Sequence, residues 1–398
     1  MDKLCGSSFW ESSLSWYTND SAPDVTICFQ QTAIAWLPAL FIGLVTPLEL
    51  KTLRSLFSQP AKPAIPWTWL SLGRTALNVA ILVVCLLEFS IVMLGYEDPE
   101  NEDKKVPLVY IITPLVKSTA VFLVLLIMMA GRKIGRRNTG GPVWLFWFIS
   151  FVCGCITYQT LIRSSKTGHI FTYGPTAFRT DSGLLDIVVS FFTVYFYLTT
   201  ANLMLLSFVD PAPIREDEDT PEDELQKYRP DKIASFPSQL LFSWVTPLMY
   251  KSLSEPIKLN DLPHIDEELL IQNAFMEFNE RHVRDKFGNR IEMKERGVVG
   301  ALWRTFGGLI LKGLCFSLVI DLFQFTQPLL LDAMITSADL AKAGQATFET
   351  SWKGVFYATL MFGAVSIQTI TISYYIYHMQ NIAIRVQAAL MSAVYRHV

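Results

Sequence analysis

The chain has 398 residues and a formal net charge of −3, and hydrophobic residues make up 51% of it against 17% for charged ones. Soluble domains carry about 25% charged residues, so this composition argues against a soluble protein. No basic patch suits nucleic acid, and we expect no nucleic-acid partner. Long apolar runs alternate with short charged ones, which is the pattern of a polytopic membrane protein.

The N-terminal tail, residues 1–28, is polar and lacks an apolar core. We therefore expect no cleavable signal peptide, and expect insertion to begin at the first membrane helix. The triplet that begins at Asn19 is a glycosylation sequon if the tail lies outside the cytosol. On that side Cys5 and Cys28 either form a disulfide or stay as two unpaired thiols. Cysteine spacing predicts no metal site, and the cysteines in apolar runs are interpreted as packing residues: Cys85, Cys153, Cys155 and Cys315.

Seven segments are long and apolar enough to cross a bilayer, which takes about 20 mostly apolar residues. A long polar stretch, 209–306, separates the first five from the last two. The sequence therefore predicts an all-α integral membrane protein. The seven segments are 29–50, 67–96, 107–130, 142–163, 182–208, 307–336 and 352–379.

The orientation follows from where Lys and Arg gather in the short loops. Loops 51–66 and 131–140 are basic, whereas loop 97–106 is mostly acidic. This places the first two loops and the stretch 209–306 in the cytosol, and the N-terminus on the extracellular or lumenal side. Loop 164–181 carries basic residues and fits this orientation less well.

The polar stretch contains an acidic linker at 216–224, an apolar pattern at helical spacing, and a polar helix predicted at 266–287. We interpret the apolar pattern as an amphipathic helix lying at the membrane interface, which Pro247 bends or begins anew. The alternative is a helix packed on a soluble domain. The pattern consists of Leu240, Leu241, Trp244, Val245, Leu248 and Met249.

Charged groups inside a bilayer are costly and tend to be paired or functional. Arg74 lies near a helix end and is expected to reach the interface with its long side chain. Glu88 and Lys117 lie deeper, both roughly 12–15 Å from the outer ends of two antiparallel helices. We hypothesise a structural ion pair between them; a substrate site is the alternative.

The last two helices also carry polar residues near mid-membrane, at Asp321, Gln324, Gln327 and Gln368. Such groups should face protein or a water-filled cavity rather than lipid. Two interpretations remain open, the wall of a substrate pathway and hydrogen bonding between helices.

Several motifs resemble those of multidrug-resistance-associated proteins, the C-subfamily of ABC transporters. The tail from Cys5 to Gln30 is similar to the extracellular tail of that family. The run from Leu240 to Leu248, LLFSWVTPL, resembles its elbow motif, and 256–262 the motif that follows. The run 385–396 resembles the helix that leaves the second core helix towards the cytosol. The resemblance spans nearly the whole chain.

The resemblance implies four parts: an extracellular tail at 1–28, a five-helix accessory membrane domain at 29–208, a cytosolic lasso linker with the elbow helix at 209–306, and the start of an ABC transmembrane domain at 307–398. The last part would comprise two helices and a truncated cytosolic extension. The family's pathway would run past Ser317, where relatives that export anionic conjugates often carry Lys. The remaining predicted pathway residues are Asp321, Gln324, Gln368, Ile372 and Ile376.

The implied function is the membrane portion of an ATP-driven exporter of amphipathic organic anions or xenobiotics, in the plasma membrane or a vacuolar or lysosomal one. ATP and Mg²⁺ belong to the full-length protein, because this sequence has no GxxxxGK[ST] phosphate loop and is not expected to be an enzyme alone. Its expected partners are the bilayer, the amphipathic substrate, and the remainder of the transporter or a full-length copy.

Two other functions share some of these features. A regulatory membrane subunit of the sulfonylurea-receptor type would dock on a channel through the first five helices. A seven-helix G-protein-coupled receptor would have the same helix count, but its local motifs are absent: the third helix ends in Met128 to Arg132 without an acidic-Arg-Tyr triplet.

Overall fold

The computed structural model describes residues 2–5, 8–15, 23–57, 67–96, 107–134, 140–167, 182–209, 234–258, 261–262, 298–342 and 348–397. Within these ranges the regular structure is helical and contains no strand. Seven helices are long and apolar enough to cross a membrane, which confirms the prediction of an all-α integral membrane protein. The chain divides into two compact units, Met1–Asp219 with Ile233–Gln239, and Thr220–Lys232 with Leu240–Val398.

The first unit contains the tail and five long helices. Two short helices, α1 (Asp2–Cys5) and α2 (Ser12–Ser15), belong to the tail, and α3 (Ile27–Phe29) continues through the π-helical turn η1 (Gln30–Ile34) into the first long helix. The long helices follow the predicted segments closely. They are α4 (Ala35–Phe57), α5 (Trp69–Tyr96), α6 (Val109–Lys133), α7 (Gly141–Thr167) and α8 (Ser182–Leu206).

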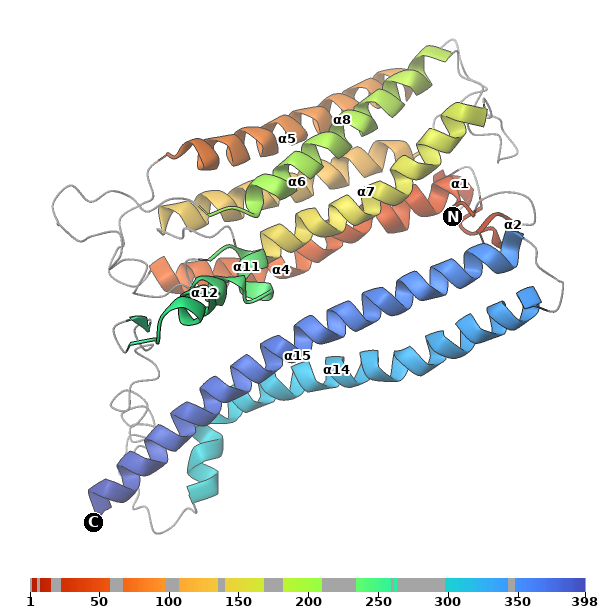
Figure 1. Ribbon diagram of the computed structural model, residues 1–398. Helices are drawn as coiled ribbons and strands as arrows, with labels where there is room; N and C mark the ends of the chain where they lie inside the picture. The colour runs from red at the N-terminus through yellow and green to blue at the C-terminus, as the bar shows by residue number, and fades with distance from the viewer. Residues whose placement is uncertain are drawn as a thin grey trace. The chain divides into compact units, whose positions relative to one another are not determined.

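The five helices form a closed circuit of contacts. Helix α4 packs against α6 and α7, α5 packs against α6 and α8, and α7 packs against α8 (Figure 1). Each long helix contributes a buried apolar side chain to one core. These include Ile42, Ile81, Val124, Trp147 and Leu203. Large apolar residues also cover the outside, such as Leu44 and Leu94. Helices that are apolar all round are typical of membrane spans.

Arg74 does not reach the interface as expected but is buried inside this unit, with 1% of its surface exposed. Its Nε donates to the carbonyl oxygen of Leu205 at 3.1 Å, and its Nη2 donates to that of Phe208 at 2.6 Å. Carbonyls at the end of a helix have no partner within the helix, and a cation there also suits the helix dipole. Arg74 therefore caps the C-terminal end of α8 from the neighbouring α5.

One turn further along α5, a second polar contact joins the same two helices. The Asn78 side-chain amide donates to the carbonyl oxygen of Arg74 at 2.7 Å and to Asn202 Oδ1 at 3.2 Å. Both asparagines are completely buried. Polar side chains that bond across helices stabilise helix association in lipid, where no water competes for them. Arg74, Asn78 and Asn202 thus form a polar seam between α5 and α8.

The second unit is built on two helices, α14 (Val298–Lys342, 45 residues) and α15 (Phe348–His397, 50 residues), which pack antiparallel (Figure 1). At 1.5 Å per residue these lengths correspond to roughly 65–75 Å, about twice the apolar thickness of a bilayer. Both helices therefore extend well beyond the predicted spans 307–336 and 352–379. They approach closely at Gly313, where an added Cβ would lie 2.6 Å from Met379 Sδ.

The elbow is not the single amphipathic helix that its pattern predicts. It consists of α11 (Phe236–Leu240), a 3-10 turn η3 (Ser243–Val245) and α12 (Thr246–Ser254). The break lies at Phe242, whose φ of 55° is left-handed and unfavourable for a bulky residue. The Phe242 ring meets the edge of Tyr377 on α15 at 5.7 Å, which holds this conformation. Pro247 lies in the first turn of α12. Of the two expected roles, bending a helix or beginning a new one, the structure has the second.

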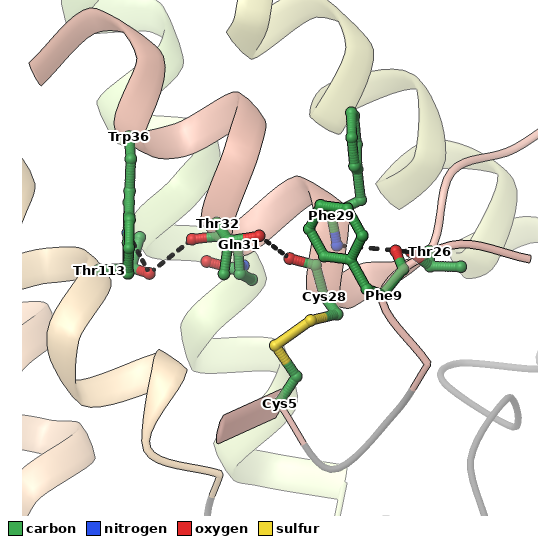
Figure 2. The surroundings of a disulfide bond; sticks show 9 residues. All are labelled: Cys5, Phe9, Thr26, Cys28, Phe29, Gln31, Thr32, Trp36 and Thr113. Atoms are coloured by element: carbon green, nitrogen blue, oxygen red, sulfur yellow. Dashed lines mark hydrogen bonds between the residues drawn. A yellow bond between two sulfur atoms is a disulfide. The ribbon is translucent and has the colours of Figure 1, made fainter. Parts of the chain in front are cut away.

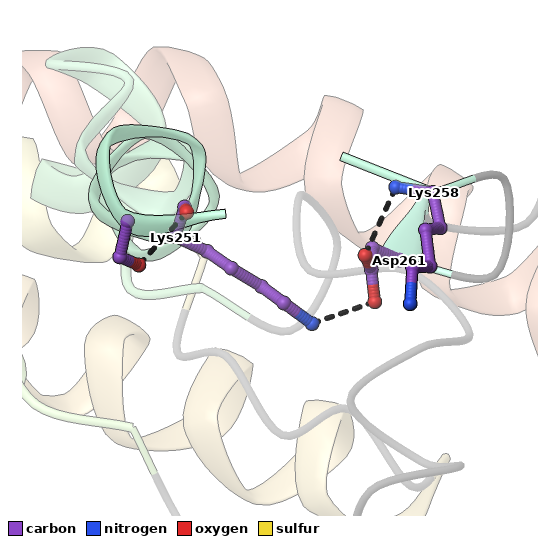
Figure 3. Close-up of polar contacts among 4 residues, drawn as sticks. Lys251, Lys258 and Asp261 are labelled. Carbon is purple, nitrogen blue, oxygen red and sulfur yellow. Dashed lines mark hydrogen bonds and ion pairs between the residues drawn. The ribbon is translucent and has the colours of Figure 1, made fainter. Parts of the chain in front are cut away.

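A charged contact fixes the segment after α12 (Figure 3). Lys251 Nζ donates to Asp261 Oδ1 at 2.6 Å, and Asp261 Oδ2 accepts from the backbone N–H of Lys258 at 3.1 Å. The hydrogen bond between the two side chains raises the pKa of Lys251 and lowers the pKa of Asp261. Exposed ion pairs contribute little to stability, so this one mainly sets the direction in which the chain leaves α12.

Replacing Arg74 with Met should destabilise the first unit, because the carbonyls of Leu205 and Phe208 would lose their buried donor. We expect a loss of about 2–4 kcal/mol, seen as a lower melting midpoint of the detergent-purified chain. The matched control is Lys51→Met, which removes an exposed cation from α4 in the same unit. Equal midpoints for the two variants would contradict the capping role of Arg74.

Candidate functional site

The predicted pathway residues divide between two parts of the α14–α15 surface. Ser317, Gln368 and Ile372 are partly buried, whereas Asp321, Gln324 and Ile376 are exposed. Within the described residues Asp321 and Gln324 make no hydrogen bond or ion pair with other side chains. Two polar groups are therefore presented on a long apolar helix without a partner from α15.

Gln368 forms a hydrogen bond between the two helices, which is one of the two interpretations that the sequence left open. Gln327 Nε2 on α14 donates a hydrogen bond to Gln368 Oε1 on α15. This contact supports a role for Gln368 in hydrogen bonding between the helices. The exposed residues of α14, Asp321 and Gln324, remain candidates for the wall of a substrate pathway.

Three aromatic side chains pack together between the same helices. Phe316 meets Tyr374 edge-on at 5.2 Å, and the rings of Tyr374 and His378 stack at 6.4 Å with 7° between their planes. The sequence analysis did not single out Phe316 or His378. The spacing of four residues between Tyr374 and His378, which places both on one helix face, was the available signal.

The first unit carries a second candidate site, where the tail is fastened to the helices (Figure 2). Cys5 and Cys28 are joined by a disulfide with an S–S distance of 2.04 Å. Both are buried and pack against Val109 at the start of α6. Of the two states left open for these cysteines, the structure has the bonded one. It fixes α1 against α3 and so anchors the beginning of the chain.

Hydrogen bonds also fasten the end of the tail and the first helical turn, on one side to α7 and on the other to α6. Thr160 Oγ1 on α7 donates to Asp24 Oδ1 at 2.7 Å and accepts from Gln30 Nε2 at 3.1 Å. The Gln30 amide also donates to the carbonyl oxygen of Val25 at 2.8 Å. We call Asp24, Gln30 and Thr160 the tail clasp. It ties the last residues of the tail and the first turn of the membrane helix to the end of α7.

On the opposite side, the same turn is fastened to α6. Thr113 Oγ1 donates to the carbonyl oxygen of Gln31 at 2.8 Å and accepts from Trp36 Nε1 at 3.3 Å (Figure 2). The backbone of the π-helical turn is therefore held between α6 and α7.

The structure does not bring Glu88 and Lys117 together. No ion pair joins them among the described residues, and Lys117 Nζ lies instead over two rings of α8, 5.8 Å from the centre of Phe192 and 5.2 Å from that of Tyr195. Ring faces attract a cation electrostatically, and this attraction grows where water is excluded. The prediction of a Glu88–Lys117 ion pair rested on equal depth in antiparallel helices, and the lysine instead contacts the rings of α8.

Some predictions lie outside the described residues. These are the glycosylation sequon at Asn19, the acidic linker at 216–224 and the polar helix at 266–287. They stay predictions.

The hydrogen bond between Gln327 and Gln368 should be measurable by a double-mutant cycle with Gln327→Leu and Gln368→Leu. We expect a coupling free energy of about 0.6–2 kcal/mol in the unfolding of the purified chain, because polar contacts across membrane helices are worth this much. Gln324→Leu combined with Gln368→Leu is the control and should show no coupling. If both cycles give the same value, no specific contact joins Gln327 and Gln368.

Breaking the tail clasp should free the tail. Thr160→Val removes both the donor to Asp24 and the acceptor of Gln30, so hydrogen exchange over residues 23–30 should become about tenfold faster. Thr119→Val is the matched control, since that hydroxyl is exposed and bonds only to Val116 in its own helix. Unchanged exchange in Thr160→Val would mean that the disulfide alone holds the tail.

Comparisons with known proteins agree with the motifs. No family model matches the chain. Curated relatives align with all of it: ATP-binding cassette sub-family C member 3 of mouse at 28% identity over 424 residues, the human member 3 at 26% over 425, and the human member 2 at 24% over 447. The chain spans about a quarter, 26%, of the length of these relatives. It is thus a relative of the sub-family C transporters, and matches an N-terminal portion of the multidrug-resistance-associated type.

Proposed function

We propose that this chain is the membrane portion that begins an ATP-driven exporter of amphipathic organic anions or xenobiotics. The observation that carries the proposal is the similarity of the whole chain to several sub-family C transporters. The order of the elements supports it: an anchored tail, a closed five-helix unit, a short interfacial elbow, and then a pair of helices long enough to continue beyond the bilayer.

In this proposal the exposed polar face of α14 is one wall of the substrate pathway. Asp321 and Gln324 would be costly against lipid, so they require a protein or water-filled surrounding. Further helices of an exporter core would provide that surrounding. Ser317 in place of a lysine leaves this wall without a cation near Asp321, so substrates would be held mainly through their apolar parts and the aromatic side chains of α15.

The nucleotide chemistry would come from outside these residues. The names of the relatives specify ATP binding, and this sequence offers no GxxxxGK[ST] loop to hold ATP phosphates and Mg²⁺. The chain would instead respond to movements that nucleotide binding drives elsewhere in the protein. We place the protein in the plasma membrane with its N-terminus outside, which would expose Asn19 to glycosylation and Cys5 and Cys28 to oxidation.

The test is transport by a chimera in which this chain replaces the segment of the mouse member 3 that it matches. Inside-out vesicles that contain the chimera should take up an amphipathic fluorescent anion only when ATP is supplied. Asp321→Leu should reduce this uptake about tenfold, because the wall would lose the charged group that keeps the pathway filled with water. Asp339→Leu, on an exposed position of the same helix beyond the predicted span 307–336, is the matched control and should transport normally.

A chimera that reaches the membrane intact but shows no uptake dependent on ATP would contradict the proposal. If that chimera then purified together with a channel through its first five helices, a regulatory subunit of the sulfonylurea-receptor type would be the better description.

A further inference from the structure

Beneath the tail clasp lies a hollow in the first unit, bounded by the start of α4 and by α6, α7 and α8. Its empty space amounts to about 390 Å³, a figure that includes open solvent, so the hollow is a half-open depression rather than an enclosed cavity. Gln30 and Gln31 form the side next to the tail, and Thr157, one turn along α7 from Thr160, lies below them. Two lining residues of the hollow are therefore held in place, Gln30 by the tail clasp and Gln31 by Thr113.

A cation without a carboxylate partner lines this hollow. Lys117 lies there with Phe192 and Tyr195, and no acidic group forms an ion pair with it among the described residues. An ammonium group has three N–H donors, and within the described residues its contacts are with the two rings of α8, which accept no conventional hydrogen bond. These donors are available to an anion in the hollow.

A second donor lines the same hollow. Gln31 is only partly buried, and within the described part of the chain its side-chain amide makes no hydrogen bond. The Gln30 amide, by contrast, is occupied by Val25 and Thr160. Because the carbonyl oxygen of Gln31 accepts from Thr113, its backbone is fixed while its amide is free to bind.

The depth of the hollow identifies the class of anion. Lys117 follows Val109, the first residue of α6, by about two turns, or roughly 12 Å, so its ammonium group lies within the membrane-spanning part. A charge there needs a partner of opposite sign. An anion with its own acyl chains reaches this depth without leaving the bilayer, and the apolar surface beside the hollow, including the half-exposed Leu37, suits such chains.

We propose that this hollow binds the phosphate headgroup of an anionic membrane lipid, with Lys117 and the Gln31 amide as its donors and the rings of Phe192 and Tyr195 as its apolar wall. The site belongs to the five-helix unit and is separate from the pathway wall on α14. Since Gln31 is positioned by the same turn that the tail clasp and the Cys5–Cys28 disulfide hold, lipid binding would depend on an anchored tail.

The experiment measures lipid binding to the purified 398-residue chain in a neutral detergent, by native mass spectrometry and by the shift in melting midpoint. The probes are dioleoyl phosphatidic acid, dioleoyl phosphatidylcholine and inorganic phosphate. We expect phosphatidic acid to bind and raise the midpoint, and the other two to do neither at the same concentration. Lys117→Met should weaken phosphatidic acid binding about tenfold or more, and Gln31→Leu by several-fold. Lys117→Arg should retain it.

The control is Lys51→Met, which removes an exposed cation from α4 away from the hollow and should leave binding unchanged. Each variant is first compared with the unaltered chain for its midpoint without lipid, which separates lost binding from lost folding. Equal binding of the two lipids, or unaltered binding of phosphatidic acid in Gln31→Leu and Lys117→Met, would overturn the proposal. If inorganic phosphate raised the melting midpoint and Lys117→Met abolished this rise, the site would bind free phosphate, and the proposal of a lipid would be overturned.

Discussion

The arrangement of this protein depends on one constraint: inside a bilayer, a polar group must find its partner in the protein, because lipid supplies none. The seam between α5 and α8 shows how the protein meets this constraint, although Asn78 Oδ1 and Asn202 Nδ2 stay buried there without a hydrogen-bond partner among the described residues. Arg74 is buried yet donates to two carbonyls at the end of α8, and Asn78 and Asn202 are bonded to each other. These contacts fix the height at which α5 and α8 pack, which apolar side chains alone would leave free to slide.

Hydropathy predicts the spans well, since crossing a bilayer requires a length of apolar chain that few other structures need. Helix ends and turns depend on other forces. The extensions of α14 and α15 beyond the membrane carry too mixed a composition to be recognised as parts of the same helices. The break at Phe242 is set by a contact with Tyr377 over a hundred residues away, which no local pattern contains.

Counting residues along a membrane helix predicts the depth of a polar side chain, but not its neighbours. Counting residues placed Glu88 and Lys117 at similar heights, and the same reasoning placed Gln327 and Gln368 in mid-membrane. Counting cannot give the direction in which a side chain leaves its helix. That direction decides that Gln327 meets Gln368 while Lys117 meets the rings of α8 instead of Glu88. The tail clasp was not predictable, because Thr160 is separated from Asp24 and Gln30 by more than a hundred residues.

Two pairs of polar residues, Asp321 with Gln324 and Lys117 with Gln31, form no side-chain hydrogen bond or ion pair with one another or with other side chains in the described part of the chain, and the constraint assigns them different roles. Asp321 and Gln324 lie exposed on a single helix face, a geometry that suits contact with further helices or with a water-filled pathway. Lys117 and Gln31 lie in a hollow that the unit itself encloses on several sides, so another helix could not readily enter. A small anionic ligand with apolar chains of its own would supply the hydrogen-bond acceptors that Lys117 and Gln31 lack. In the two proposals, the five-helix unit holds a lipid in the hollow beside its anchored tail, and the polar face of α14 serves transport, so that each task belongs to one compact unit.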